Sequence, residues 1–201
     1  MSNMKRNACL LAIAMIWPWG TLLAGDTPVP DVTVKAILSG DGIQSHGTGN
    51  GGAGVMAETI SLKGSNARID YDGGSQLRGS IFRIGDRIWL LPAGSKRPLP
   101  VSHLPLASVT HLNTDKPCWE LGFPCLQVED RLIAGRRATG WRYDHAGKAG
   151  PDGTDSGVFW IDQETGVVLA IKAKDTSDRA YNMDTMAVEY APVPDSTFAV
   201  P

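Results

Sequence analysis

Histidine and serine are the residues of this chain that could act in catalysis, but their spacing does not form a catalytic motif. The histidines are His46, His103, His111 and His145, and no pair has the i, i+4 spacing of a helical zinc motif. The sequence also lacks a Gly-x-Ser-x-Gly nucleophile elbow. We therefore predict a protein that is not an enzyme, with no metal site and no cofactor.

Two loops have compositions that bind ions in some proteins, but each lacks the rest of the pattern. Residues 40–54 are rich in glycine and do not end in the Lys-Ser/Thr pair of a phosphate-binding P-loop. Asp152 and Asp155 lie in a turn over residues 150–157, without the longer acidic series and distal glutamate of an EF-hand. We interpret both segments as loops, with weak calcium binding as the minor alternative for the second.

Two cysteines suit a structural disulfide. Six residues separate Cys118 from Cys125, and Gly122 and Pro124 among them favour a turn that brings the thiols together. In an oxidising compartment a bridge is the expected outcome. Its contribution is about 2.5 kcal/mol by loop entropy. A thiol-exchange site or half of a metal site are the alternatives, although redox motifs usually have two intervening residues.

The amino-terminal residues have the parts of a secretion signal. Lys5 and Arg6 form a short positive region, and an apolar run follows that reaches Ala24. A retained membrane anchor is the alternative, but Pro18 and Gly20 interrupt the run before it reaches the roughly 20 residues of a spanning helix. We therefore predict export from the cytoplasm, with cleavage near Ala24 and no stable membrane anchor afterwards.

We expect residues 1–24 to be a signal peptide and residues 25–201 to form a single β domain. Loss of two basic residues with the signal would change the formal net charge from −2 to −4. A mildly acidic domain has no broad attraction for nucleic acid. Arg131, Arg136 and Arg137 could contact a lipid head group or a partner, but a solvated strand face is the favoured interpretation.

Short strands alternate with turns along the rest of the chain. Apolar residues alternate with polar ones over residues 32–39, and Gly85-Asp86 is a two-residue hairpin signal. No segment has the sustained 3.6-residue period of an amphipathic helix, so the sequence predicts a mainly β fold with little helix. The expected strands cover residues 32–39, 55–63, 67–71, 80–84, 87–91, 126–130, 132–134, 137–143, 158–161, 167–173 and 183–190.

These strands present apolar side chains that the chain has few helices to cover. Phe82 with Ile84, and Ile88 with Leu90, are spaced to face one side of a sheet. The glycine-rich segment 40–54, a proline-rich segment over residues 92–117, or a bound apolar molecule could cover that side. This imbalance is the residue-level indication of a ligand cavity.

A succession of short motifs carries a family resemblance. The motifs are LKGSNARID at residues 62–70, IGDRIWLLP at 84–92, VEDRLIAGRRA at 128–138, FWIDQETGVVL at 159–169 and PDSTFAVP at 194–201. Their order resembles the periplasmic lipoprotein-carrier superfamily of LolA and LolB type, in particular its small uncharacterised secreted members. The resemblance covers roughly residues 55–201.

The resemblance implies a curved antiparallel sheet that forms an unclosed half barrel. In relatives the apolar hollow of that barrel accepts acyl chains or apolar peptide groups. We therefore predict a periplasmic protein that binds a lipid or lipoprotein acyl chain. The alternative is an envelope structural or protein-interaction module with a filled core and no small-molecule ligand. The candidate lining residues are Phe82, Ile84, Ile88, Leu90, Trp141, Trp160, Leu169 and Ile171.

Overall fold

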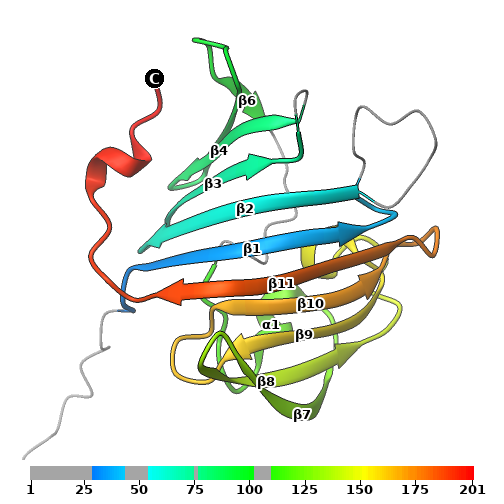
Figure 1. The fold of residues 1–201 in the computed structure, drawn as a ribbon. Coiled ribbons are helices and arrows are strands. Elements are labelled where there is room, and N and C mark those ends of the chain that lie inside the picture. Colours follow the sequence, from blue (N-terminus) through cyan, green and yellow to red (C-terminus); the bar gives the residue numbers. More distant parts are fainter. Residues whose placement is uncertain (1–28, 44–53, 75–76, 102–109) are drawn as a thin grey trace, which may run out of the picture.

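The computed structural model describes residues 29–43, 54–74, 77–101 and 110–201, which form one curved antiparallel sheet (Figure 1). The expected signal peptide lies outside the described residues. The sheet has 11 strands in the spatial order β6-β5-β4-β3-β2-β1-β11-β10-β9-β8-β7, and it does not close. This confirms the predicted mainly β half barrel.

Strand bounds follow the expected segments closely. The strands are β1 (Val32–Gly40), β2 (Gly54–Lys63), β3 (Asn66–Asp72), β4 (Arg78–Ile84), β5 (Arg87–Pro92), β6 (Leu99–Val101), β7 (Leu126–Ile133), β8 (Arg136–Tyr143), β9 (Ser156–Asp162), β10 (Val168–Lys174) and β11 (Ala180–Glu189). Short helical turns are α1 (Pro117–Leu121), η2 (Pro151–Gly153) and η3 (Asp195–Phe198). The sequence predicts two segments, residues 126–130 and 132–134, where the structure has the single strand β7, whose register with β8 shifts between Val128 and Arg131.

The chain reaches the two edges of the sheet in turn. It starts at the centre with β1 and proceeds by antiparallel neighbours to the edge strand β6. It then continues to the opposite edge strand β7 and returns through β8, β9 and β10 to β11, which pairs with β1. Because β6 and β7 lie at opposite edges of the sheet, the connection between them, which contains α1, links the two edges.

The hydrophobic core lies on one side of this sheet, which we call the inner face. Val32, Val34, Ala36 and Leu38 of β1 define it, since all four are at most 2% exposed. The same face continues into neighbouring strands through register, as Val34 opposes Ile60 on β2. Side chains alternate along a strand, so the intervening residues point to the outer face.

The C-terminal segment covers part of the outer face. After β11 the chain turns back along the sheet, and η3 contacts β3 (Figure 1). Phe82 is on the outer face because it opposes Arg68, and it is 1% exposed. The Arg68 guanidinium lies 5.1 Å from the Phe82 ring centroid and donates a hydrogen bond to the Thr197 carbonyl at 3.1 Å. Phe198 is also buried.

A buried carboxylate stabilises the β9–β10 hairpin. Asp162 is fully buried and accepts hydrogen bonds from Arg136 at 2.7 and 3.2 Å, the Tyr190 hydroxyl at 3.0 Å and the Glu164 amide at 2.9 Å. Burial alone would raise the pKa of Asp162, but these hydrogen bonds, with that of Arg136 the strongest, hold the pKa below its usual range. Arg136 therefore does not belong to a free basic surface.

We expect Asp162→Asn to lower the free energy of unfolding by about 3 kcal/mol at pH 7, because it leaves a half-buried arginine without its buried charged partner. The depressed pKa means that this contribution is present at neutral pH and is lost as pH falls through the acid range. Urea denaturation should therefore show a difference from wild type that shrinks at low pH. The control is Glu164→Gln, which removes an exposed partner of the same arginine and should cost less than about 1 kcal/mol. Equal losses in both variants would contradict this account.

Candidate apolar-ligand site on the inner face

The inner face of strands β8–β11 is filled. The ring centroid of Phe123, just after α1, lies 5.1 Å from that of Tyr143, which lies 5.9 Å from that of Phe159. Leu112 and Cys118 join the same core cluster from the connection to β7. The fully buried side chains beneath this cover include Tyr143, Phe159, Ile161, Ile171 and Met183. This half of the barrel therefore has its own cover.

A disulfide closes the loop that carries this cover. Cys118 and Cys125 are bonded, which confirms the expected pairing, and their Cα atoms are 5.9 Å apart. Gly122 ends α1 in the left-handed conformation with a φ of 81°, and its amide donates to the carbonyls of Cys118 and Trp119. The bridge fits a protein exported to an oxidising compartment.

The other half of the inner face, on β4 and β5, is less well covered. Ile81 opposes Leu90, and the two residues extend the row of buried core residues that includes Ile69 on β3. Ile81, Ile88 and Leu90 are all only half-buried, whereas their counterparts on β9 and β10 are inaccessible to solvent. The described structure thus leaves an apolar strip exposed along this half.

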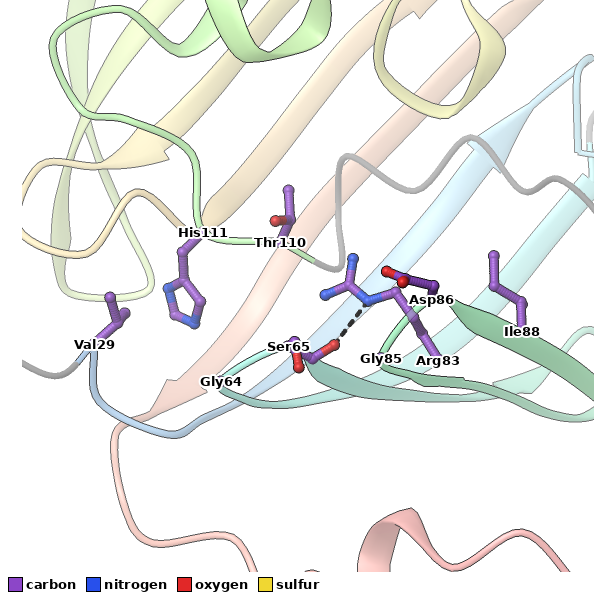
Figure 2. A pocket seen from close by; sticks show the side chains of 9 residues that line it. All are labelled: Val29, Gly64, Ser65, Arg83, Gly85, Asp86, Ile88, Thr110 and His111. Atoms are coloured by element: carbon purple, nitrogen blue, oxygen red, sulfur yellow. Dashed lines mark hydrogen bonds between the residues drawn. The ribbon is translucent and has the colours of Figure 1, made fainter.

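A groove of about 720 Å³ opens at one end of this strip (Figure 2). Turns between β2 and β3 and between β4 and β5 form one wall, and the segment before α1 forms the other. Its size falls within the range of small-molecule sites. The lining residues are Val29, Gly64, Ser65, Arg83, Gly85, Asp86, Ile88, Thr110 and His111.

Two nitrogen-bearing side chains give the groove its polarity. Arg83 Nε donates to the Ser65 carbonyl at 3.1 Å, and burial lowers the pKa of this arginine. His111 Nδ1 lies 3.1 Å from the Thr165 carbonyl, so Nδ1 carries the proton, while Nε2 is buried without a partner among the described residues. Burial is the main cause that lowers the pKa of His111, and the charge of Arg83 adds to it.

Glu58 is a second polar group on the inner face. It opposes Ala36 on β1 and Tyr71 on β3. The row of paired residues that contains Arg83 lies two inner-facing positions further along the strands. Burial, followed by repulsion from Asp152, raises the pKa of Glu58 to about 8. Its carboxyl is therefore mostly protonated at neutral pH and is a neutral hydrogen-bond donor.

The structure distributes the candidate lining residues over both faces. Register places Ile88 and Leu90 on the inner face beside the groove, and Trp141 and Ile171 on the inner face of the covered half. Leu169 is completely buried. The remaining candidates, Phe82, Ile84 and Trp160, lie on the outer face. The fold therefore does not bring the predicted lining residues together on one face.

Trp160 has a structural environment on that outer face. Its Nε1 donates to the Glu129 carbonyl at 3.2 Å, and the Arg131 guanidinium lies 4.1 Å from its ring centroid. Arg83, His111 and Glu58 are not among the lining residues predicted from the sequence. The alternation of side chains along β4 would have indicated Arg83 once Phe82 was known to face outward, because neighbouring residues of a strand point to opposite faces.

Metal and membrane features are absent from the part of the chain that the structure describes. Within residues 29–43, 54–74, 77–101 and 110–201, no group of three or more His, Cys, Asp or Glu side chains is arranged to hold a metal ion. In the same residues, no helix has the length and apolar character needed to cross a membrane.

Comparison with known proteins supports the architecture but assigns no family by sequence. No family model matches the chain, and no curated protein is significantly similar to it. An uncharacterized conserved protein from Thermus thermophilus has a similar structure, with a TM-score of 0.54 at 5% identity over 85% of this chain and 84% of that protein. MucB matches with a TM-score of 0.52 at 11% identity over 86% of this chain.

The chain spans only 57% of MucB. The complex of MucA and MucB from Pseudomonas aeruginosa gives a TM-score of 0.50 at 12% identity, over 84% of this chain and 55% of that one. A LolA superfamily protein, NE2245 from Nitrosomonas europaea, matches with a TM-score of only 0.41 at 9% identity, over 86% of this chain and 91% of that one. Identities this low show the fold alone, which is the mainly β half barrel that the sequence predicts.

The raised pKa of Glu58 leads to a pH-dependent stability. Because the folded state keeps this proton above the unfolded pKa of 4.5, stability should decrease as pH rises from about 4.5 to 8. Glu58→Gln removes this dependence, so at pH 8 the variant should exceed wild type by on the order of 3 kcal/mol in urea denaturation. Glu189→Gln, on the exposed surface of β11, is the control and should retain the wild-type slope. An unchanged slope in Glu58→Gln would show that this carboxyl is ionised in the folded protein.

Proposed function

We propose that this chain is a periplasmic, non-enzymatic protein that binds an apolar ligand, a lipid or lipoprotein acyl chain, on the open half of its inner face. The unequal cover of the two halves carries this proposal. Phe123 and α1 fill the half under β8–β10, whereas Ile81, Ile88 and Leu90 remain half-buried beside a groove of about 720 Å³. An apolar chain on this strip would remove it from water, which is favourable in proportion to the area buried.

Other observations support the periplasmic location and the carrier role. The Cys118–Cys125 bridge suits an oxidising compartment, and residues 1–24 have the composition of a cleaved signal. The half barrel is the architecture of the lipoprotein carriers that the sequence resembles. Because one fold can serve many functions, the exposed strip and its groove support the proposal more directly than the likeness does.

Protein binding is the second candidate function. MucB, which shares the fold, has been solved in a complex with MucA. In the present chain Trp119 is 84% exposed and Leu126 is 64% exposed. These two residues adjoin the bonded Cys118 and Cys125 and the unpaired edge of β7. Exposed aromatic residues near a free strand edge are typical of a surface that meets another protein.

The acyl-chain proposal predicts a face-specific effect on binding. Leu90→Gln introduces a polar group into the open strip and should weaken the binding of a fluorescent fatty-acid probe about tenfold. The matched control is Leu91→Gln, the same change one residue along, which points to the outer face and should leave the affinity within roughly twofold. Fluorescence titration of the purified protein measures both. Absence of binding to the wild type at micromolar concentrations would refute the proposal.

The protein-binding candidate predicts a different pattern. Trp119→Ser should abolish capture of an envelope protein by the immobilised chain, whereas Leu90→Gln should leave capture intact. Pull-down from envelope extract, followed by direct binding of the purified captured protein, measures this. Capture that survives Trp119→Ser would remove this surface from consideration.

A further inference from the structure

We propose that the ligand is an amphiphile with an anionic head group, a carboxylate or a phosphate, which Arg83 binds in the groove while the apolar chain extends along the β4–β5 strip. The inference rests on the proposed function and deepens it, because it names the chemical class of the ligand. Three features of the groove support it.

The first feature is the guanidinium of Arg83, which has no carboxylate partner among the described residues. Three arginines in the described residues are half-buried, and two of them, Arg68 and Arg136, are paired with Asp70 and Asp162. No carboxylate among the described residues lies within 4.0 Å of Arg83. A cation that is partly removed from water without a counter-charge favours the binding of an anion.

The second feature is the direction of its free donors. Nε is engaged with the Ser65 carbonyl, whereas Nη1 and Nη2 make no hydrogen bond to a described residue. Figure 2 shows the guanidinium extending from the end of β4 toward Thr110 and His111 on the opposite wall. A planar guanidinium matches the geometry of carboxylate and phosphate oxygens, so these nitrogens can bind either group.

The third feature is that a cationic end adjoins an apolar strip. Arg83 opposes Ile88, and the next inner-facing pair along the same two strands is Ile81 with Leu90. Such an arrangement fits a molecule whose charged end lies at the groove and whose apolar part follows the strands. A free anion would contact only the cationic end, and a neutral apolar molecule would contact only the apolar strip.

The charged groups around the groove are compatible with an anion. His111 is on the opposite wall, and its buried Nε2 becomes a second donor if the ring is protonated. Asp86 also lines the groove, but it is exposed and forms no ion pair with Arg83 within 4.0 Å, so water screens its charge. Asp31 interacts electrostatically with His111 and favours its protonated form, but burial and the charge of Arg83 oppose this effect, and the pKa of His111 is lowered.

The test compares three competitors with the same sixteen-carbon acyl chain, chosen as probes. Palmitic acid carries a carboxylate, palmitoyl lysophosphatidic acid a phosphate, and monopalmitoylglycerol no charge. Each displaces a neutral fluorescent apolar probe from the purified wild-type protein below its critical micelle concentration. We expect at least one anionic competitor to bind about tenfold more tightly than the neutral one, as for a hydrogen bond to a charged group.

Substitutions then assign this preference to one side chain. Arg83→Gln should reduce the preference for anions to within roughly twofold and leave the affinity for monopalmitoylglycerol unchanged. Arg83→Lys keeps the charge without the planar donor pair and should retain part of it. The matched control is Arg87→Gln, which removes one positive charge from the same β4–β5 hairpin at an exposed, outward-facing position. It should retain the full preference.

Each outcome decides the inference. Equal affinity for charged and neutral competitors, or a preference that survives Arg83→Gln, would overturn the head-group assignment while leaving the proposed apolar binding intact. No displacement by any competitor would overturn both. Inorganic phosphate that binds as tightly as lysophosphatidic acid would indicate a simple anion site and would refute the amphiphile. A preference for one anionic competitor identifies the head group.

Discussion

An antiparallel sheet that curves without closing must cover the apolar side of its curve, and this constraint shapes the whole molecule. The strands run outward from β1 to one edge and return from the opposite edge to β11. The connection between the edges therefore has to cross the sheet, and its described part, residues 110–125, packs against the inner face of β8–β10. This described part covers the β8–β10 half, whereas Ile81, Ile88 and Leu90 on β4 and β5 stay half-buried.

Local chemistry made much of this fold predictable from the sequence. Gly85-Asp86 indicates a hairpin turn, and the structure places β4 and β5 on either side of it, with Gly85 at a φ of 56°. The spacing of Cys118 and Cys125 likewise predicts the disulfide, because six intervening residues that include a glycine can form a turn that brings the two Cα atoms within disulfide-bonding range. Only residues close in the chain determine these features, so the sequence indicates them directly.

The orientation of β4 was not predictable in the same way. Phe82 and Ile84 are apolar and alternate, so they were assigned to the hollow, yet the C-terminal segment covers Phe82 on the opposite face through Arg68 and Thr197. Thr197 is 115 residues from Phe82 in the sequence, and nothing in the local pattern shows that it covers that side. Because Phe82 faces outward, its neighbour Arg83 faces inward. The pairing of β4 with β3 and β5, together with this long-range cover, therefore determines which residues form the candidate site.

The polar groups of the open half define a direction along it. Arg83 and Glu58 occupy rows of the inner face separated by the apolar row that contains Ile81 and Leu90. At a strand rise of about 3.3 Å per residue, those two rows are roughly 13 Å apart. One end is cationic, whereas at the other burial and repulsion from Asp152 raise the pKa of Glu58 to about 8, so that the Glu58 carboxyl is mostly uncharged at neutral pH. An acyl chain that extends from an anionic head at Arg83 would therefore meet the uncharged carboxyl of Glu58. Ionisation of Glu58 above that pKa would place a charge against the apolar chain.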